Sequence, residues 1–164
     1  MINPAKLKRA QDEIAAAEAA GHLSIPVQYE EVRQHLPFFV ACIKESLRLD
    51  PPAPALFPRV TPKHEAKVID GFLIPPNTEI TTNQYVASRD PVMYAPDPEA
   101  FRPERWLESQ EKWNEMDASH FIFGMGPRAC LGKDIAVLEM YKLLPEVRSY
   151  VMACILGQGR YLTD

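Results

Sequence analysis

Proline is the residue that most restricts how this chain can fold. The 164 residues include 16 prolines, about twice the average share of roughly 5%. Each proline fixes its own φ angle, lacks an amide donor and biases the preceding residue toward extended geometry. The prolines gather at 51–62, 75–76 and 91–103. We therefore expect irregular chain with short strands in the middle of the protein, and helices on both sides of it.

Helices are predicted throughout the first fifty residues. Apolar residues at helical spacing predict one over 4–20, which Gly21 ends. A short helical turn follows at 29–35. Pro37 then opens a stronger helix, because proline is favoured at the first helical position, and this helix must end before Pro51.

The middle of the chain predicts small elements. Apolar triplets on either side of Asp70-Gly71 indicate a hairpin. A third short strand is expected at 78–82 and one helical turn at 83–88. From residue 89 to residue 116 we expect ordered coil, broken by a turn at 103–107.

A last helix is predicted to start near Cys130. No linker, internal repeat or second domain is visible, so the sequence predicts a single mainly α fold with a minor β-sheet. The final helix carries one apolar stripe, formed by Leu131, Ile135, Leu138 and Tyr141.

Composition argues against several classes of function. A net charge of −4 gives no reason to expect nucleic acid as a partner. No apolar run approaches the roughly 18 residues that span a bilayer, and the charged first twenty residues do not resemble a signal peptide. Three cysteines without C-x-x-C spacing and four scattered histidines favour neither a disulfide framework nor a zinc site. Elemental analysis would detect a zinc protein directly.

The stretch 123–132 carries the chemistry, with the pattern F-x-x-G-x-R-x-C-x-G opening into the last helix. Metals bind thiolate, and a helix N-terminus favours that anion, so Cys130 is the candidate ligand. Gly126 and Gly132 let backbone approach a flat macrocycle. Phe123 can shield the sulfur, and Arg128 is placed to bind a haem propionate. The alternative is a buried cysteine beside a glycine-rich turn, but five specified residues favour the ligand.

This stretch resembles the haem-binding signature of cytochrome P450 proteins. Two more matches follow the family's order: 45–48 is similar to the E-x-x-R motif of the K helix, and 103–106 to the P-E-R-W/F turn of the meander. The resemblance implies the proximal, C-terminal part of the P450 fold, helices J to L. We expect a partial P450 domain at 1–147 and a divergent, aberrant tail at 148–164.

The resemblance also assigns roles to three further arginines and one glutamate. Glu45 and Arg48, three residues apart on a helix, can pair, although a solvated surface pair is the default interpretation of that spacing. With Arg105, the family pattern implies a structural charge cluster that fixes the meander. Arg59 would reach a haem propionate from the other side, the alternative being an exposed loop arginine.

The family implies a haem-dependent monooxygenase with haem b (iron protoporphyrin IX). Such an enzyme splits dioxygen, inserts one atom into an organic substrate and reduces the other to water. The implied partners are a lipophilic small-molecule substrate and an electron-donating reductase. The implied location is the endoplasmic reticulum membrane, reached through an N-terminal anchor.

The chain has no match to the acid–alcohol pair that the family carries on its distal helix. We therefore expect a truncated form that begins after that helix and lacks the anchor. The alternative function is a haem-binding fragment, or structural remnant, without turnover. Such a fragment would expose apolar surface that promotes association.

Overall fold

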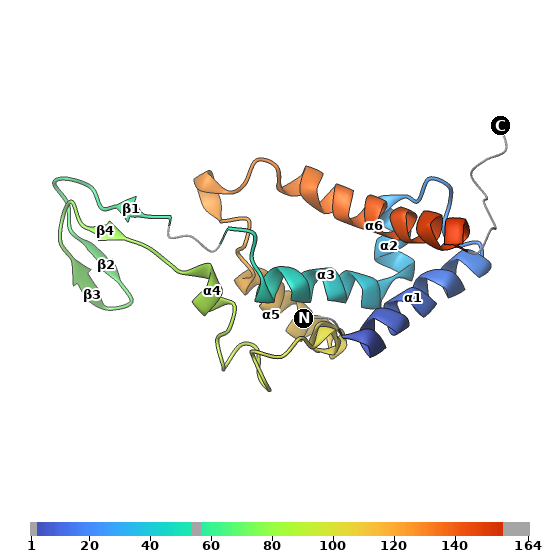
Figure 1. The fold of residues 1–164 in the computed structure, drawn as a ribbon. Helices are drawn as coiled ribbons and strands as arrows, with labels where there is room; N and C mark the ends of the chain where they lie inside the picture. Colours follow the sequence, from blue (N-terminus) through green and yellow to red (C-terminus); the bar gives the residue numbers. More distant parts are fainter. Residues whose placement is uncertain (1–2, 54–56, 156–164) are drawn as a thin grey trace.

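The helices form one body and the strands extend from it on one side (Figure 1). In this computed structural model residues 3–53 and 57–155 are described, and for 148–155 the backbone alone. The body contains α1 (Pro4–Ala19), α2 (Tyr29–His35), α3 (Pro37–Leu49) and the long α6 (Lys133–Ile155). The structure is thus mainly α-helical with a minor β component, as predicted.

Local sequence signals set the ends of the first helices. The Asn3 side chain accepts a hydrogen bond from the amide of Lys6 at 3.2 Å and caps α1. Gly21, at φ +72°, lies just beyond the end of this helix. Proline opens α3 and a Pro-Pro pair follows its end. The predicted bounds of these helices are confirmed to within one residue.

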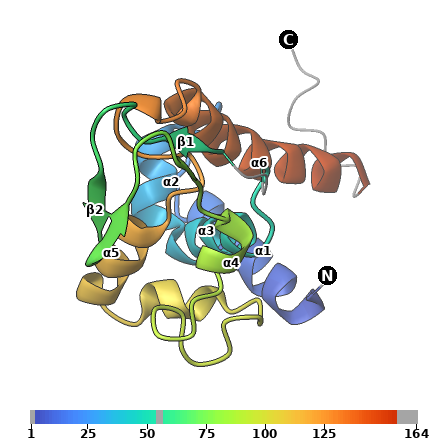
Figure 2. The same ribbon diagram turned by 90° about the vertical axis from the view of Figure 1, so that its left-hand side faces the viewer.

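The strands form two small antiparallel pairs. The hairpin predicted at Asp70-Gly71 is confirmed: β2 (Lys67–Ile69) pairs with β3 (Phe72–Ile74), and both turn residues have positive φ. The predicted third strand, β4 (Glu79–Ile80), pairs with β1 (Arg59–Val60) instead of joining the hairpin. Both pairs lie beyond the helical body in Figure 1, and in the view from that side they are drawn in front of the helices (Figure 2).

One helix contradicts the prediction of ordered coil over 89–116. The short α4 (Gln84–Ala87) and the 3₁₀ turn η1 (Pro103–Leu107) fall where turns were predicted. However, α5 (Gln110–Ser119) begins inside the predicted coil. Its N-cap is Ser109, whose Oγ accepts the amide of Lys112 at 3.1 Å. Its sequence is mostly polar, with few apolar residues to reveal a helical period.

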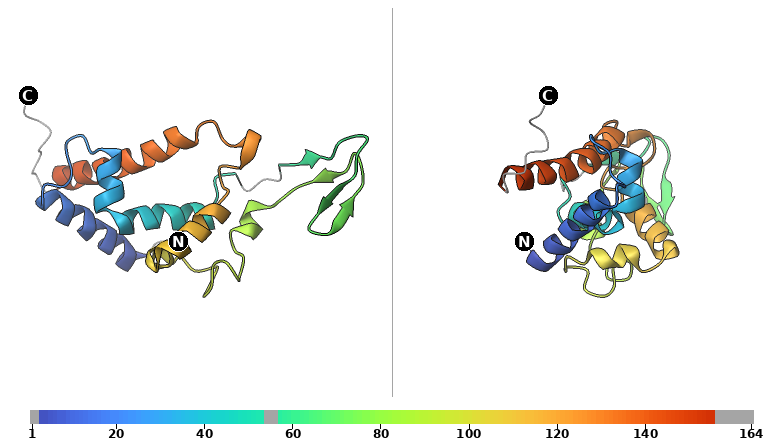
Figure 3. Two further views of the ribbon diagram at one scale, coloured as in Figure 1. Left: turned by 180° about the vertical axis from the view of Figure 1, so that it is seen from behind. Right: turned by 90° about the vertical axis from the view of Figure 1, so that its right-hand side faces the viewer.

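The core has two parts, and α3 contributes residues to both. This helix lies in the middle of the helical body (Figure 3). The larger buries residues of α1, α2, α3 and the middle of α6. The smaller joins α3 to α5 and to the segment before α5, and consists of Ala41, Tyr94, Trp106 and Met116. Full burial of one large apolar side chain contributes on the order of 1.5–3 kcal/mol. The helix that carries Glu45 and Arg48 is therefore the central element of the protein.

The predicted apolar stripe of α6 is buried at one end only. Tyr141 is buried and stacks on Tyr29 with ring centroids 5.2 Å apart. Leu131, Ile135 and Leu138 are exposed. A hollow of about 700 Å³ lies between the first half of α6 and the facing helices α3 and α5. Within the described part of the chain, other residues therefore cover the stripe at Tyr141 and leave its first three members exposed.

Candidate functional site

The segment that precedes α6 folds into a tight loop closed by its own backbone. The amide of Gly124 donates to Phe121 O at 2.7 Å, and the amide of Cys130 donates to Phe123 O at the same distance. Between them lies the 3₁₀ turn η2 (Gly126–Arg128). The second bond ties the cysteine backbone directly to Phe123, so the two move as a unit.

Cys130 lies ahead of the last helix, not at its first residue. Its carbonyl accepts the amide of Lys133 at 3.3 Å, and the helical ladder opens one bond later, from Ala136 N to Gly132 O at 2.9 Å. Helix α6 starts at Lys133, a correction of three residues to the start predicted from the motif. The thiol is free and exposed. A Cβ atom added to Gly132 would lie 3.9 Å from the Cys130 Sγ, which places this glycine beside the sulfur.

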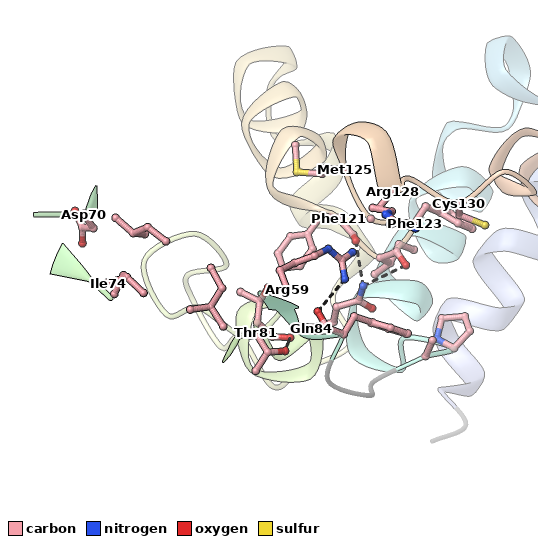
Figure 4. Close-up of a pocket in the computed structure, with 18 of the residues that line it drawn as sticks. Arg59, Asp70, Ile74, Thr81, Gln84, Phe121, Phe123, Met125, Arg128 and Cys130 are labelled. Carbon is pink, nitrogen blue, oxygen red and sulfur yellow. Dashed lines mark hydrogen bonds between the residues drawn. The ribbon is translucent and has the colours of Figure 1, made fainter. Parts of the chain in front are cut away.

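A hollow of about 980 Å³ opens beside the loop, and four of the predicted site residues line it. Phe123, Arg128 and Cys130 come from the loop, and Arg59 comes from β1, some seventy residues earlier in the chain. Figure 4 shows the side chains that line this hollow, with Arg59, Arg128 and Cys130 among those labelled. Gly126 and Gly132 are not among the lining residues.

Two guanidinium groups line one largely apolar hollow and offer hydrogen-bond donors to an anionic ligand. Arg59 Nη1 donates to the carbonyls of Phe57 and Pro58, both at 3.1 Å, which holds the side chain close to its own backbone. Arg128 comes from η2, immediately before the cysteine. A guanidinium can bind a carboxylate through two parallel hydrogen bonds. The site therefore combines a soft sulfur donor with cations suited to a ligand that carries carboxylates.

The glycine that most needs to lack a side chain is Gly124, which the sequence analysis did not select. At φ +69°, a Cβ on Gly124 would lie 3.3 Å from the carbonyl oxygen of Arg128. Gly126 also has positive φ (+63°), but an added Cβ would meet nothing within 4 Å. The F-G-x-G spacing was the available signal for Gly124. Its close contact arises from the folding of the loop and is not encoded in the spacing.

We expect Gly124→Ala to destabilise the protein by about 1–2 kcal/mol, because alanine would be strained at this φ and would press on the Arg128 carbonyl. The matched control is Gly21→Ala, which has a similar φ of +72° and open space around it. Urea unfolding of the two variants measures the difference. Equal losses would show that the close approach to Arg128 has no energetic effect.

The three charged residues predicted to form a cluster meet behind the loop, and all have 0% exposure. Arg48 donates to both carboxylate oxygens of Glu45, at 2.9 and 2.8 Å. Arg105 Nε donates to the same carboxylate at 3.1 Å. The remaining donors of the two arginines bind backbone carbonyls, among them Ser88 O and Pro98 O, both 2.7 Å from Arg48 Nη1. The cluster thus joins α3 to the long irregular segment.

Two donors to Glu45 were not predicted. Trp106 Nε1 donates to Oε2 at 2.9 Å, and the backbone amide of Arg102 donates to Oε1 at 2.9 Å. Burial by itself raises the pKa of Glu45, but the hydrogen bonds from Arg48 and Arg102 outweigh it and hold the pKa below its ordinary value of 4.5. The carboxylate is therefore charged and fully hydrogen-bonded although it is buried.

The family model described as Cytochrome P450 matches residues 1–147 of this sequence. The chain belongs to the cytochrome P450 family. It is 42% identical over 145 residues to cytochrome P450 monooxygenase cicH of Emericella nidulans, which is 88% of this chain and 29% of that protein. It is 38% identical to cytochrome P450 monooxygenase mpaDE of Penicillium roqueforti over 100% of this chain and 19% of that one.

A solved structure of a zebrafish cytochrome P450 with progesterone is similar in fold. The TM-score is 0.68 at 31% sequence identity, over 87% of this chain and 30% of that one. The chain thus spans less than a third of the length of each of these relatives. Of the helices in the described part of the chain, none has both the length and the hydropathy that crossing a bilayer requires.

Membership of the P450 family implies a haem cofactor, and the residues around the hollow fit one. An exposed cysteine sulfur can ligate iron. Arg59 and Arg128 supply cations for two carboxylates, and the apolar lining suits a macrocycle. A side chain at Gly124 would press on the loop backbone and one at Gly132 would lie beside the sulfur, so these two glycines leave that space open.

Proposed function

We propose that this chain forms the cysteinate-bearing part of a haem-dependent monooxygenase with haem b. The observation that carries the proposal is the convergence of Cys130, Arg59 and Arg128 on one apolar hollow of about 980 Å³. The family membership of residues 1–147 agrees with it. Bound haem would supply the oxygen chemistry, in which one atom of dioxygen enters an organic substrate and the other leaves as water.

The residues of the chain bind, orient and shield. With haem bound, Cys130 Sγ would ligate its iron, and the negative charge of a thiolate there would increase the electron density at the metal. Arg128 and Arg59, which come from two different elements and line the same hollow, would bind the carboxylates of the haem. Phe123, tied to the cysteine amide, would shield one side of the sulfur once haem is bound. Gly126 is the first residue of η2 and has a positive φ, which glycine adopts without strain. Gly132 leaves room beside the sulfur.

The proposed substrate class follows from the lining of the hollow, and the proposed electron donor and location follow from the family. The lining includes Phe57, Phe72, Ile74 and Ile80, and such a surface favours a lipophilic small molecule. The proposed electron donor is a separate reductase. The proposed location is the endoplasmic reticulum membrane, as the family suggests. The divergent tail over 148–164 also stays a prediction, because residues 156–164 lie outside the described residues. Sequencing of the transcript across this region tests it.

A second candidate is a haem-binding fragment without turnover. It is favoured by the exposure of Cys130, Leu131 and Ile135, since a ligand site normally covers most of its ligand. Incubation of the purified chain with haem, a reductase and dioxygen separates the two candidates. Oxidation of a lipophilic substrate by this chain alone would exclude the fragment.

The absorption spectrum of reduced, carbon monoxide-treated protein tests the ligand. We expect a red-shifted Soret band with the native chain and its loss in Cys130→Ser, because serine cannot supply a thiolate. The control is Cys42→Ser. Cys42 lies half-buried on α3, where burial raises the pKa of the thiol to about 11. A band that survived in Cys130→Ser, or vanished in Cys42→Ser, would refute the assignment.

A further inference from the structure

Gln84 lies outside the loop that carries Cys130 and donates hydrogen bonds to it. This residue opens α4 and its side chain is buried, with 8% exposure. Its Nε2 donates to Phe121 O at 3.2 Å and to Ile122 O at 3.5 Å, the interactions drawn in Figure 4. These two carbonyls directly precede Phe123, whose own carbonyl accepts the Cys130 amide at 2.7 Å. A short series of hydrogen bonds therefore runs from α4 to the cysteine.

The other end of this series reaches the buried charge cluster. The amide of Ser88, just after α4, donates to Gln84 O at 2.9 Å. The carbonyl of Ser88 accepts Arg48 Nη1 at 2.7 Å. Arg48 is fixed in turn by Glu45. The four-residue helix α4 is thus hydrogen-bonded to the buried cluster through Ser88 and to the loop through Gln84.

The orientation of the Gln84 amide follows from its partners. Carbonyl oxygens only accept hydrogen bonds, so the nitrogen must face the loop and Oε1 must point away from it. Within the described part of the chain, Gln84 Oε1 and His120 Nε2 are both buried without a hydrogen-bond partner. Both residues line a small cavity of about 10 Å³, with Ser88 and Ser119 at its edge. That is room for one water molecule, which could bridge the two atoms.

We propose that Gln84 is a positioning residue for the cysteine ligand: its amide transmits the fixed geometry of the Glu45–Arg48 cluster to the loop that presents Cys130. Its relevance to haem rests on the proposed function, whereas its effect on the loop does not. A side chain that merely filled space would serve equally well as leucine. Two aligned donors toward successive carbonyls have a directional role that leucine cannot take over.

Amide hydrogen exchange in the isotope-labelled full chain, without added haem, tests the proposal. In Gln84→Leu we expect the Cys130 amide to exchange about tenfold faster, the loss expected for one to two hydrogen bonds. Gln84→Glu should loosen the loop at least as much, because a carboxylate oxygen would face two carbonyl oxygens. The amide of Val40 in the first turn of α3, which donates to Leu36 O at 3.0 Å, should keep its protection.

The matched controls are Gln34→Leu and Gln34→Glu, made at an exposed glutamine on α2, and they should leave Cys130 exchange unchanged. Unchanged exchange in the Gln84 variants would overturn the proposal. So would a loss of protection that is equal at Cys130 and in α3, because that indicates general destabilisation. If Gln84→Leu does not fold, Gln84→Asn gives the same comparison, since its shorter amide cannot reach the carbonyls.

A spectroscopic comparison separates this proposal from the proposed function. In haem-loaded protein, Gln84→Leu should lower the fraction of the thiolate-type Soret band after reduction and carbon monoxide treatment. The Gln34 variants should not lower it. Failure of the native chain to bind haem would refute the proposed function and leave the exchange result standing. Normal thiolate ligation in Gln84→Leu would overturn the positioning role.

Discussion

Glu45→Ala is expected to destabilise the protein by about 3–5 kcal/mol, the loss typical of a buried ion pair broken from one side. Arg48 and Arg105, both at 0% exposure, would keep their charges with no carboxylate to compensate them. The indole N–H of Trp106 and the amide of Arg102 would lose their acceptor as well. Urea unfolding measures the change. The expected loss is a large fraction of the free energy of unfolding of a typical domain, which is about 5–15 kcal/mol.

The chain contains a matched control for this substitution. Glu30 and Arg33 form a pair with the same three-residue spacing on α2, at 3.1 Å, but their side chains are 63% and 55% exposed. Glu30→Ala should therefore change the free energy of unfolding by less than about 0.5 kcal/mol. Similar losses at positions 30 and 45 would show that burial of the cluster does not determine its energetic weight.

This pair of glutamates also shows what the sequence can and cannot determine. Both belong to an i, i+3 pair on a helix, and spacing alone does not distinguish the buried one from the exposed one. The family resemblance of 45–48 and 103–106 supplied that distinction. The resemblance did not predict the hydrogen bonds that Trp106 and Arg102 donate to Glu45, because these bonds depend on how the segment after α4 passes over α3.

Local chemistry accounts for the elements that were predicted correctly. Prolines bound α3 at both ends, and Asp70-Gly71 has the positive φ angles that the β2–β3 hairpin requires. Elements that depend on tertiary contacts were missed. Helix α5 has few apolar residues and is recognised mainly by its Ser109 cap. The position of Gln84 against the loop joins residues 37 apart, which no local pattern records.

Four residues of the candidate site were predicted together because the motif brings three of them within eight positions of the chain. Phe123, Arg128 and Cys130 share a loop, and Arg59 joins them across the hollow. The start of α6 was placed three residues early, because a cysteine in such a motif suggests the helix N-terminus itself. The backbone instead closes the loop on Cys130 first, and the helix begins at Lys133.

Stability should decline in weak acid, and His120 is the expected cause. Its ring lies against Trp106 with centroids 5.4 Å apart. Burial, with a smaller effect from the Lys44 cation, lowers the pKa of His120 from 6.5 to about 4. Between these values the unfolded chain binds a proton that the folded chain does not. The free energy of unfolding should therefore decrease as pH falls through this window, by roughly 3 kcal/mol in total.

His120→Phe should remove this acid-sensitive step, because phenylalanine keeps a ring against Trp106 and does not titrate. Urea unfolding of both proteins between pH 6.5 and about 4 measures the difference, and His64→Phe, at an exposed position, should retain the native slope. Glu45 does not affect the slope in most of this window. Its pKa in the folded chain lies below 4.5, so its contribution to the free energy of unfolding is lost only as the pH falls below 4.5. If the free energy of unfolding of His120→Phe changed with pH as it does in the native chain, protons taken up elsewhere in the chain would be the cause of the decline. The acid sensitivity would then carry no information about the cavity that His120 shares with Gln84.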